Sequence, residues 1–344
     1  MHISDFDYDL PSELIAQEPL VERDASQMLV LDREKQTWSD SSFKNFTQYL
    51  RPNDVVVVNN SRVIPARLTG RREETSGQVE IFLVRELEPQ VWEALVRPGA
   101  RLKKGSRAMF GEGKLVAEML DEPGPELRRV RFHCEGSFDD VLAEIGSTPL
   151  PPYIKRPHGA SAEDRERYQT VYSKHRGAIA APTAGLHFTP EALEEVRRHA
   201  SLAEITLHVG YGTFEPVRVD DVANHSVSGE QFEISESVAE AINDARANGG
   251  RIIVVGTTTM RALESAATEN NTVAAGKGLA TLTIKPGHRF RIADALLTNF
   301  HLPRSSLLIL VSTFAGREFV LRAYHHAVAE RYRFYSYGDC MLIL

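Results

Sequence analysis

The sequence has 344 residues, of which 42% are hydrophobic and 25% are charged, a composition typical of a folded globular protein rather than of a disordered or fibrous chain. One hydrophobic core does not usually serve a chain of this length, so we expect two domains. The net charge of −7 argues against a generally basic nucleic-acid-binding protein, so any contact with RNA must come from a local basic patch.

Several other classes of protein are also excluded. No apolar stretch is long enough to span a membrane, and the acidic start at residues 1–11, broken by a proline, does not resemble a secretory signal. We therefore expect a cytoplasmic protein. Its two cysteines, Cys134 and Cys340, form no CxxC pair, which predicts neither a disulfide framework nor a zinc knuckle. The histidines lack the spacing of metal ligands, so we expect no bound metal.

The N-terminal part of the chain alternates between helix and strand. We expect a helical turn at residues 10–16, a strand at 28–32, a short helix at 43–50 and a strand at 54–58. The β-branched residues of the last strand suit a buried position in a sheet. This strand is expected to end at a polar loop formed by residues 59–62.

From about residue 67 to residue 134 the pattern changes to short strands separated by turns with glycine or proline. The expected strands cover residues 78–85, 91–97, 114–120 and 128–134. This pattern indicates a small antiparallel β-barrel. A helix at residues 136–145 and a proline-rich connection follow. We therefore place an inserted β-barrel domain at residues 66–149, and a discontinuous α/β domain at residues 1–65 and 150–344.

After residue 160 the alternation of helix and strand returns. We expect strands at residues 177–180, 204–209 and 251–255, and helices at 163–173, 190–199, 237–248, from 260, at 305–315 and at 319–332. This order of elements is typical of a layered α/β sheet. The predicted fold class is therefore α/β, with a discontinuous layered α/β domain and an inserted small antiparallel β-barrel.

Five polar loops of the α/β domain carry residues suited to binding a small molecule. Residues 256–261 place a glycine, three threonines and an arginine between a strand and a helix, where free backbone amides could hold a phosphate or a carboxylate. An ordinary helix cap is the alternative. Residues 181–191, 207–217, 298–306 and 332–343 show related patterns. Five such loops at the ends of strands and helices indicate the polar cleft of an α/β enzyme.

At these loops the sequence resembles the S-adenosylmethionine:tRNA ribosyltransferase-isomerases of queuosine biosynthesis. The resemblance starts at FDYDLPSELIAQEPLVERDASQMLVLD and continues through VNNSRVIPARLTG, PLPPYIKR and RYQTVYSKHRGAIAAPTAGLHF. It then includes HVGYGTFEPVRV, GGRIIVVGTTTMRALES, LLTNFHLPRSSLLILVSTFAG and YRFYSYGDCMLI. Together these segments cover nearly the whole chain.

The resemblance implies a discontinuous α/β domain with an inserted β-barrel, in agreement with the pattern of elements. It also implies a reaction. The ribosyl group of S-adenosylmethionine is transferred to the aminomethyl group of 7-aminomethyl-7-deazaguanine at the wobble position of tRNA and is isomerised. The products are epoxyqueuosine-tRNA, adenine and methionine. The expected partners are thus S-adenosylmethionine, as a consumed co-substrate, and tRNA, and we expect a monomer without a cofactor.

This chemistry calls for particular side chains. A sulfonium acidifies the adjacent ribose carbon, so the enzyme must supply a base, a proton donor for adenine and a site that excludes water. The acid–base candidates are His187, His208, Glu215, His225, Glu230 and His301. The expected substrate-binding residues are Asn59, Arg62, Thr183, Gly185, Phe188, Gly210, Gly212, Thr213, Gly256, Thr257, Thr258, Arg261, Asn299, Tyr337 and Asp339. The expected tRNA contacts are Arg97, Arg101, Lys103, Lys104 and Arg107. The alternative is that these charged residues form a solvent-exposed turn that binds no RNA.

The chain departs from the family pattern at some of these loops. The family commonly reads HHVGAGTF where this chain has Leu207 and Tyr211, and HxMHxE where it has Val227 and Ser228. A base at position 228 is therefore excluded. Two other functions are considered: an S-adenosylmethionine-dependent RNA methyltransferase, which would release S-adenosylhomocysteine, and an RNA-binding module that uses only the barrel and performs no reaction.

Overall fold

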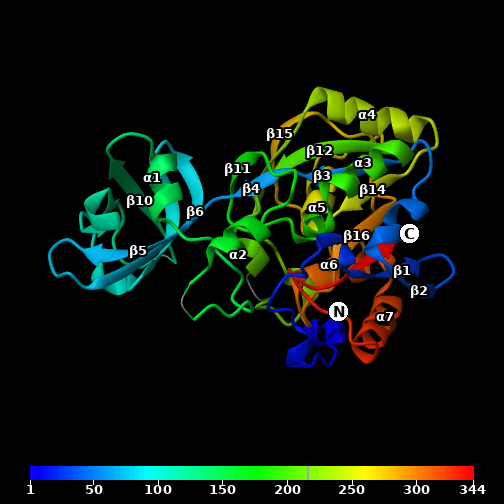
Figure 1. The fold of residues 1–344 in the computed structure, drawn as a ribbon, viewed down its shortest axis with the longest axis horizontal. Coiled ribbons are helices and arrows are strands. Elements are labelled where there is room, and N and C mark those ends of the chain that lie inside the picture. Colours follow the sequence, from blue (N-terminus) through cyan, green and yellow to red (C-terminus); the bar gives the residue numbers. More distant parts are fainter. Residues whose placement is uncertain (125, 158, 215–216) are drawn as a thin grey trace.

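The chain folds into a larger α/β part and a smaller β-barrel that projects from it (Figure 1). The computed structural model describes residues 1–124, 126–157, 159–214 and 217–344. The barrel strands lie within residues 66–149, and the α/β part is formed by residues that precede and follow this segment. The predicted fold class is therefore confirmed, whereas the predicted domain limits stay predictions.

The main sheet is mixed, with parallel strands at its centre. Its strands are β1 (Gln27–Asp32), β2 (Thr37–Ser42), β3 (Val55–Asn59), β12 (Ser201–Leu207), β13 (Glu230–Ile234), β14 (Ile252–Val255), β15 (Gly276–Ala280), β16 (Ala295–Asn299) and β17 (Cys340–Ile343). They lie side by side in the order β15, β13, β12, β3, β14, β16, β17, β1, β2. The four neighbours from β12 to β16 run parallel to each other, whereas β13 and β17 run antiparallel to their inner neighbours.

Helices cover both faces of this sheet. These are α3 (Pro190–His199), α4 (Glu236–Ala247), α5 (Thr257–Ser265), α6 (Ser306–Ala315), α7 (Arg317–Ala329) and the 3-10 helix η4 (Phe43–Tyr49). Val55 and Val57 of β3 pack in the core formed with α4 to α7, whereas Val56 and Val58 pack in a second core with α3 and η4. Burial on both faces explains the continuous β-branched run of this strand.

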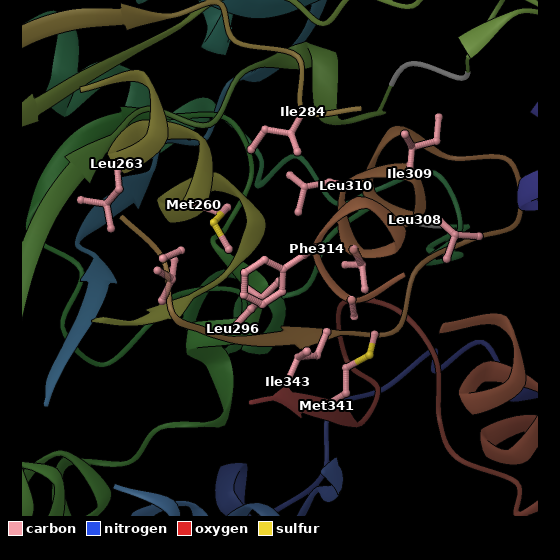
Figure 2. Close-up of a cluster of buried hydrophobic side chains, with 14 of the residues drawn as sticks. Met260, Leu263, Ile284, Leu296, Leu308, Ile309, Leu310, Phe314, Met341 and Ile343 are labelled. Atoms are coloured by element: carbon pink, nitrogen blue, oxygen red, sulfur yellow. The ribbon is translucent and has the colours of Figure 1, made fainter. Parts of the chain in front are cut away.

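Helices α5 and α6 are fixed to the sheet by one hydrophobic cluster (Figure 2). Met260 and Leu263 of α5 and Leu310 and Phe314 of α6 converge over the sheet, beside the side chains of β16 and β17. Met260, Leu263 and the β16 residue Leu296 have no exposed surface. This packing sets the position of the first turn of α5.

The barrel is closed and antiparallel. It consists of β5 (Arg67–Arg72), β6 (Gln78–Glu88), β7 (Val91–Arg97), β8 (Arg107–Phe110), β9 (Leu115–Met119) and β10 (Leu127–Cys134), in the spatial order β10, β7, β6, β5, β8, β9. Helix α1 (Phe138–Ile145) buries Phe138 and Leu142 in the barrel core. Ile64 and Ile179, which lie outside the barrel strands, pack in the same core and connect the barrel to the α/β part.

Two barrel strands, β5 and β8, were not predicted from the sequence. Strand β5 contains three arginines and a glycine, which together hide the usual alternation of apolar and polar residues. Gly70 is required there because a Cβ at this position would lie 2.2 Å from the carbonyl oxygen of Met109 in β8. The two strands approach each other so closely that glycine is required at this position. Glycine in turn weakens the sequence pattern by which a strand is predicted.

The loop predicted at residues 59–62 is wrong. Residues Ser61–Val63 form a short strand, β4, which pairs in parallel with β11 (His175–Ala178). The polar side chain of Asn59 bonds to both the amide and the carbonyl of Leu207, so it fixes the end of β3 to β12. Its carbonyl oxygen also accepts a bond from the Ser61 amide, which sends the chain directly into β4.

The remaining elements are short. Helix α2 covers only Ala162–Arg167, so the helix predicted to continue to residue 173 ends early. The 3-10 helices besides η4 are η1 (Ile3–Phe6), η2 (Ser12–Leu14), η3 (Arg23–Ala25), η5 (Gly99–Arg101), η6 (Gly111–Gly113), η7 (Thr183–His187), η8 (Tyr211–Phe214) and η9 (Val222–Asn224). Within the described residues, no helix has the length and apolar character needed to cross a membrane.

Candidate active site

A cavity of about 260 Å³ lies at one edge of the main sheet. The parallel strands β14 and β16 end at this edge, and the loop between β16 and α6 closes one side of the cavity. Because β13 and β17 are antiparallel to their inner neighbours β12 and β16, the residues before these two strands reach the same edge. Four of the five predicted polar loops, together with residues 335–336 of the fifth, therefore meet in one place, as expected for an α/β enzyme.

The first turn of α5 forms one wall of the cavity. Gly256, the N-cap, has φ of 89°, a conformation that suits glycine and turns the chain sharply out of β14. Thr257 and Thr258 follow, both buried and both lining the cavity. The hydroxyl of Thr258 has no partner among the described residues. The backbone amides of this turn have no acceptor within the helix, as at every helix start.

Asn299, the last residue of β16, lines the cavity from the strand next to β14. Its side-chain nitrogen donates to the carbonyl of Tyr335 at 3.0 Å and to Nε2 of His187 at 3.3 Å. These bonds fix the orientation of the amide, and its oxygen is left buried without a partner among the described residues. Since buried polar atoms are nearly always paired, the Asn299 oxygen and the Thr258 hydroxyl indicate positions where a bound molecule would complete the pairing.

Two predicted acid–base residues, His225 and His301, line the cavity. Nε2 of His225 lies 2.8 Å from the hydroxyl of Ser306, and Nε2 of His301 lies 3.1 Å from that of Thr298. Burial and the nearby Lys285 lower the pKa of His225, and burial lowers the pKa of His301 to about 3. Both rings are thus neutral near pH 7. Because such a low pKa makes His301 a weak base, His225 is the better placed to accept a proton.

Arg261 and Glu230 form a buried ion pair beside the cavity. The guanidinium Nη1 lies 2.5 Å from the Glu230 carboxylate, and the other nitrogens donate to the carbonyls of Ser228, Ala280 and Leu282. The second carboxylate oxygen of Glu230 accepts the amide of Gly210 at 2.8 Å. Burial raises the pKa of Glu230, and Arg261 opposes this rise. The predicted use of Arg261 as a contact to an anionic ligand stays a prediction, but in this structure its guanidinium is engaged within the protein.

Other predicted acid–base residues lie away from the cavity. His187 is buried behind Asn299, with Nδ1 at 2.8 Å from the hydroxyl of Ser26, and burial lowers its pKa to about 4. Since Nε2 of His187 accepts a bond from Asn299, its ring is positioned to orient that amide. His208 lies against Gly177, where an added Cβ would be 2.8 Å from its Nδ1. Glu215 lies outside the described residues.

The predicted substrate-binding residues divide into two groups. The cavity is lined by Thr183, Gly212, Gly256, Thr257, Thr258, Arg261 and Asn299. Among the described residues that line it, there is no Asn59, Arg62, Gly185, Phe188, Gly210, Tyr337 or Asp339. Phe188 is buried against Phe43 and Phe46, and the carboxylate of Asp339 accepts the amides of Gln27 and Arg333. The side chain of Thr213 lies outside the described part.

Three tyrosines that line the cavity were missed by the sequence analysis. These are Tyr153, Tyr168 and Tyr335. The hydroxyl of Tyr153 lies 2.6 Å from that of Ser336, and its ring centroid lies 3.9 Å from that of Tyr335. Tyr335 has φ of 74°, which is uncommon outside glycine and often marks functional sites. The proline-rich connection PLPPYIKR, which carries Tyr153, was the available signal.

The predicted tRNA contacts lie on the barrel. Arg97, Arg101, Lys103, Lys104 and Arg107 are all exposed, and Arg107 pairs with Glu73 at 3.4 Å. Arg97 also lines a cleft of about 400 Å³ between the barrel and the α/β part, together with Phe82 and Tyr211. Pro152 lines both this cleft and the cavity, so the two are neighbours.

No group of three or more histidine, cysteine or acidic side chains within the described residues is arranged to hold a metal ion. The expectation that the protein binds no metal stays a prediction.

Comparison with known proteins identifies the family. Residues 3–343 match the family model described as "Queuosine biosynthesis protein". Proteins from Desulforamulus reducens and Pelotomaculum thermopropionicum, both named S-adenosylmethionine:tRNA ribosyltransferase-isomerase, are 48% and 49% identical to this chain over 345 residues, with 100% of each chain covered. The chain belongs to this family. This result confirms the resemblance found in the sequence motifs. It also confirms that the chain is an enzyme, a transferase of queuosine biosynthesis.

A solved structure supports the same conclusion. The crystal structure of an S-adenosylmethionine tRNA ribosyltransferase from Thermotoga maritima is similar to this chain, with 36% sequence identity and a TM-score of 0.55. The match covers 99% of this chain and 100% of the other. The barrel and the α/β part described here therefore form the fold of a ribosyltransferase-isomerase.

The buried histidines predict that the protein loses stability in acid. An unfolded histidine takes up a proton near pH 6.5, whereas the folded pKa values of His187 and His301 are about 4 and about 3. As the pH falls below 6.5, the unfolded state binds more protons and is favoured. We expect each histidine to cost about 2 kcal/mol of unfolding free energy between pH 7 and pH 5, measured by urea denaturation. His301→Gln should weaken this pH dependence and the exposed His199→Gln should not; equal slopes in both variants would contradict the assignment.

The Arg261–Glu230 pair predicts a loss of stability when one partner is removed. Arg261→Ala should lower the unfolding free energy by roughly 3–5 kcal/mol, because Glu230 is left buried without its counter-charge. Arg261→Met combined with Glu230→Leu should recover part of this loss, and the exposed Arg218→Ala serves as the control. If Arg261→Ala unfolds like the wild type and loses only activity, Arg261 contacts the ligand and does not anchor the fold.

Proposed function

We propose that this enzyme transfers and isomerises the ribosyl moiety of S-adenosylmethionine onto the aminomethyl group of 7-aminomethyl-7-deazaguanine at the wobble position of tRNA. The products are epoxyqueuosine-tRNA, adenine and methionine. The observation that carries this proposal is that the motifs shared with the family, which lie far apart in the sequence, line one cavity at the sheet edge. S-adenosylmethionine is the co-substrate, and no resident cofactor is required.

The cavity offers groups for the first step, removal of a proton from the ribose carbon next to the sulfonium. His225 is neutral near pH 7, is partly buried and is held by the hydroxyl of Ser306. It would accept the proton at a ring nitrogen. The electron pair left on carbon would form a double bond to the adjacent ring carbon as that carbon's bond to the ring oxygen breaks, and the oxygen would form a carbonyl as the bond to adenine breaks. The departing adenine takes up a proton, for which the protonated His225 ring is the available donor. Burial keeps His301 neutral, so at neutral pH it can donate or accept a hydrogen bond but carries no proton to release as an acid.

The cavity walls suit the cationic donor. Phe300, Leu310 and Ile284 provide apolar surface that excludes water from the reacting centre. The rings of Tyr153 and Tyr335 can stabilise the sulfonium by cation–π attraction, and the free amide oxygen of Asn299 can accept a bond from an amino group of the donor. Among the described lining residues there is no aspartate or glutamate, so neutral groups must perform this recognition.

The neighbouring cleft has groups that suit the binding of tRNA. It lies between barrel and sheet and contains Arg97 and the aromatic pair Phe82 and Tyr211, whose ring centroids are 6.3 Å apart. Cations and aromatic rings are the groups that bind single-stranded RNA. A wobble base in this cleft would approach the donor across Pro152.

The proposed reaction predicts its products. Incubation of the protein with S-adenosylmethionine and tRNA that bears the aminomethyl-deazaguanine should release adenine and methionine in equal amounts, detected by liquid chromatography and mass analysis of the tRNA nucleosides. Transfer RNA with unmodified guanine at the wobble position is the control and should give neither product. Formation of S-adenosylhomocysteine in place of adenine would show that the protein is an RNA methyltransferase.

The basic turn of the barrel predicts the salt dependence of tRNA binding. Because the whole chain is acidic, affinity should depend on a few local cations, and three phosphate contacts would give a log–log slope against salt of roughly −2 to −3. Replacing Arg101, Lys103 and Lys104 with alanine should flatten this slope and raise the KM for tRNA, with little change for S-adenosylmethionine. The matched control replaces Lys35, Arg197 and Arg198 instead. If both triple variants keep the wild-type slope and affinity, tRNA does not bind at this turn.

A further inference from the structure

The start of α5 combines two features of an anion site. Its amides point out of the helix at Thr257 and Thr258, and neither amide has an acceptor among the described residues. The helix dipole adds a partial positive charge at the same place. A helix start alone is common and often binds nothing.

Thr258 distinguishes this helix start from an ordinary one. The residue is 8% exposed, it lines the cavity, and its hydroxyl is buried without a partner among the described residues. The next residue, Thr259, shows the usual alternative, because its hydroxyl donates to the carbonyl of Val255 at 2.6 Å. Thr258 makes no such bond, although a buried hydroxyl without a partner is costly. The hydroxyl oxygen lies 3.8 Å from where a Cβ on the N-cap Gly256 would be, so it lies at the helix start and can act as a third donor there.

The cations of the cavity are already engaged. Arg261 is paired with Glu230, and Arg304 is paired with Asp7 at the surface. His225 and His301 have lowered pKa values and carry no charge near pH 7. An anionic group in this cavity must therefore be held by neutral donors, and the start of α5 is where they gather.

From this we infer that the start of α5, through the amides of Thr257 and Thr258 and the hydroxyl of Thr258, binds the carboxylate of the methionyl group of S-adenosylmethionine. This inference rests on the proposed function, which supplies the ligand. The carboxylate is the one anionic group of that donor, and a helix start binds such a group well. An RNA phosphate would need to enter a cavity lined largely by buried side chains.

The test compares two ligands and three variants. Binding of S-adenosylmethionine and of its decarboxylated form is measured by equilibrium dialysis, in the presence of tRNA with unmodified guanine, which cannot accept the sugar. The wild type should bind S-adenosylmethionine at least tenfold more tightly. Thr258→Val should lose about tenfold in affinity for S-adenosylmethionine only, and Thr258→Ser should retain it. Thr259→Val, the same change one residue along, should bind both ligands like the wild type.

The outcomes separate this site from the proposed function. Equal binding of both ligands by the wild type, or an equal loss for both in Thr258→Val, would overturn the carboxylate site. If the expected ligand preference is found but no adenine is released with modified tRNA, the site stands and the proposed reaction fails. If adenine is released and the preference is absent, only the site fails. A wild type that does not bind S-adenosylmethionine at all would contradict both.

Discussion

The buried ion pair between Arg261 and Glu230 is the interaction on which the cavity depends. From the first turns of α5, the guanidinium reaches β13 through Glu230 and the end of β15 through the Ala280 carbonyl. Glu230 in turn holds the loop after β12 through the amide of Gly210. The strands β12, β13 and β15 and the helix α5 are thus all held by the Arg261–Glu230 pair. Since an unpaired buried charge is very costly, the four elements must keep this arrangement together or lose it together.

The sheet topology explains why the remaining walls converge. Parallel strands place their carboxyl ends, and the loops that follow, at one edge. Here the antiparallel strands β13 and β17 bring the segments that precede them, with His225 and Tyr335, to that edge as well. The hydrophobic cluster of Figure 2 holds α5 and α6 against β16, so Thr258 and Ser306 are carried on rigid helix starts. The groups for binding and for acid–base chemistry are therefore positioned by packing, before any ligand is present.

Much of this fold could be predicted from the sequence, because local patterns determine it. Helix α3 was predicted with its observed bounds, since a threonine cap, a proline and an amphipathic repeat all coincide there. Strand β5 was missed because Gly70 serves a close strand contact and the surrounding residues are charged, and strand β8 was missed because it has only four residues. The motifs of the cavity were recognised, but the partners of their side chains were not. The segment GTTTMRALES does not reveal that Arg261 bonds to β13 and β15, because these strands are distant in sequence. In the same way, no local pattern reveals that His187 bonds to the side chain of Asn299.

In the arrangement that we propose, the donor occupies the cavity at the sheet edge while the Arg261–Glu230 pair stays intact. A crystal structure of the protein with S-adenosylmethionine bound tests this most directly. We expect the donor to lie between the start of α5, Asn299 and the tyrosine pair, with its carboxylate at Thr258 and with Arg261 still bonded to Glu230. A donor bound in the cleft beside the barrel, or an Arg261 side chain that has left Glu230 to bind the donor, would contradict it.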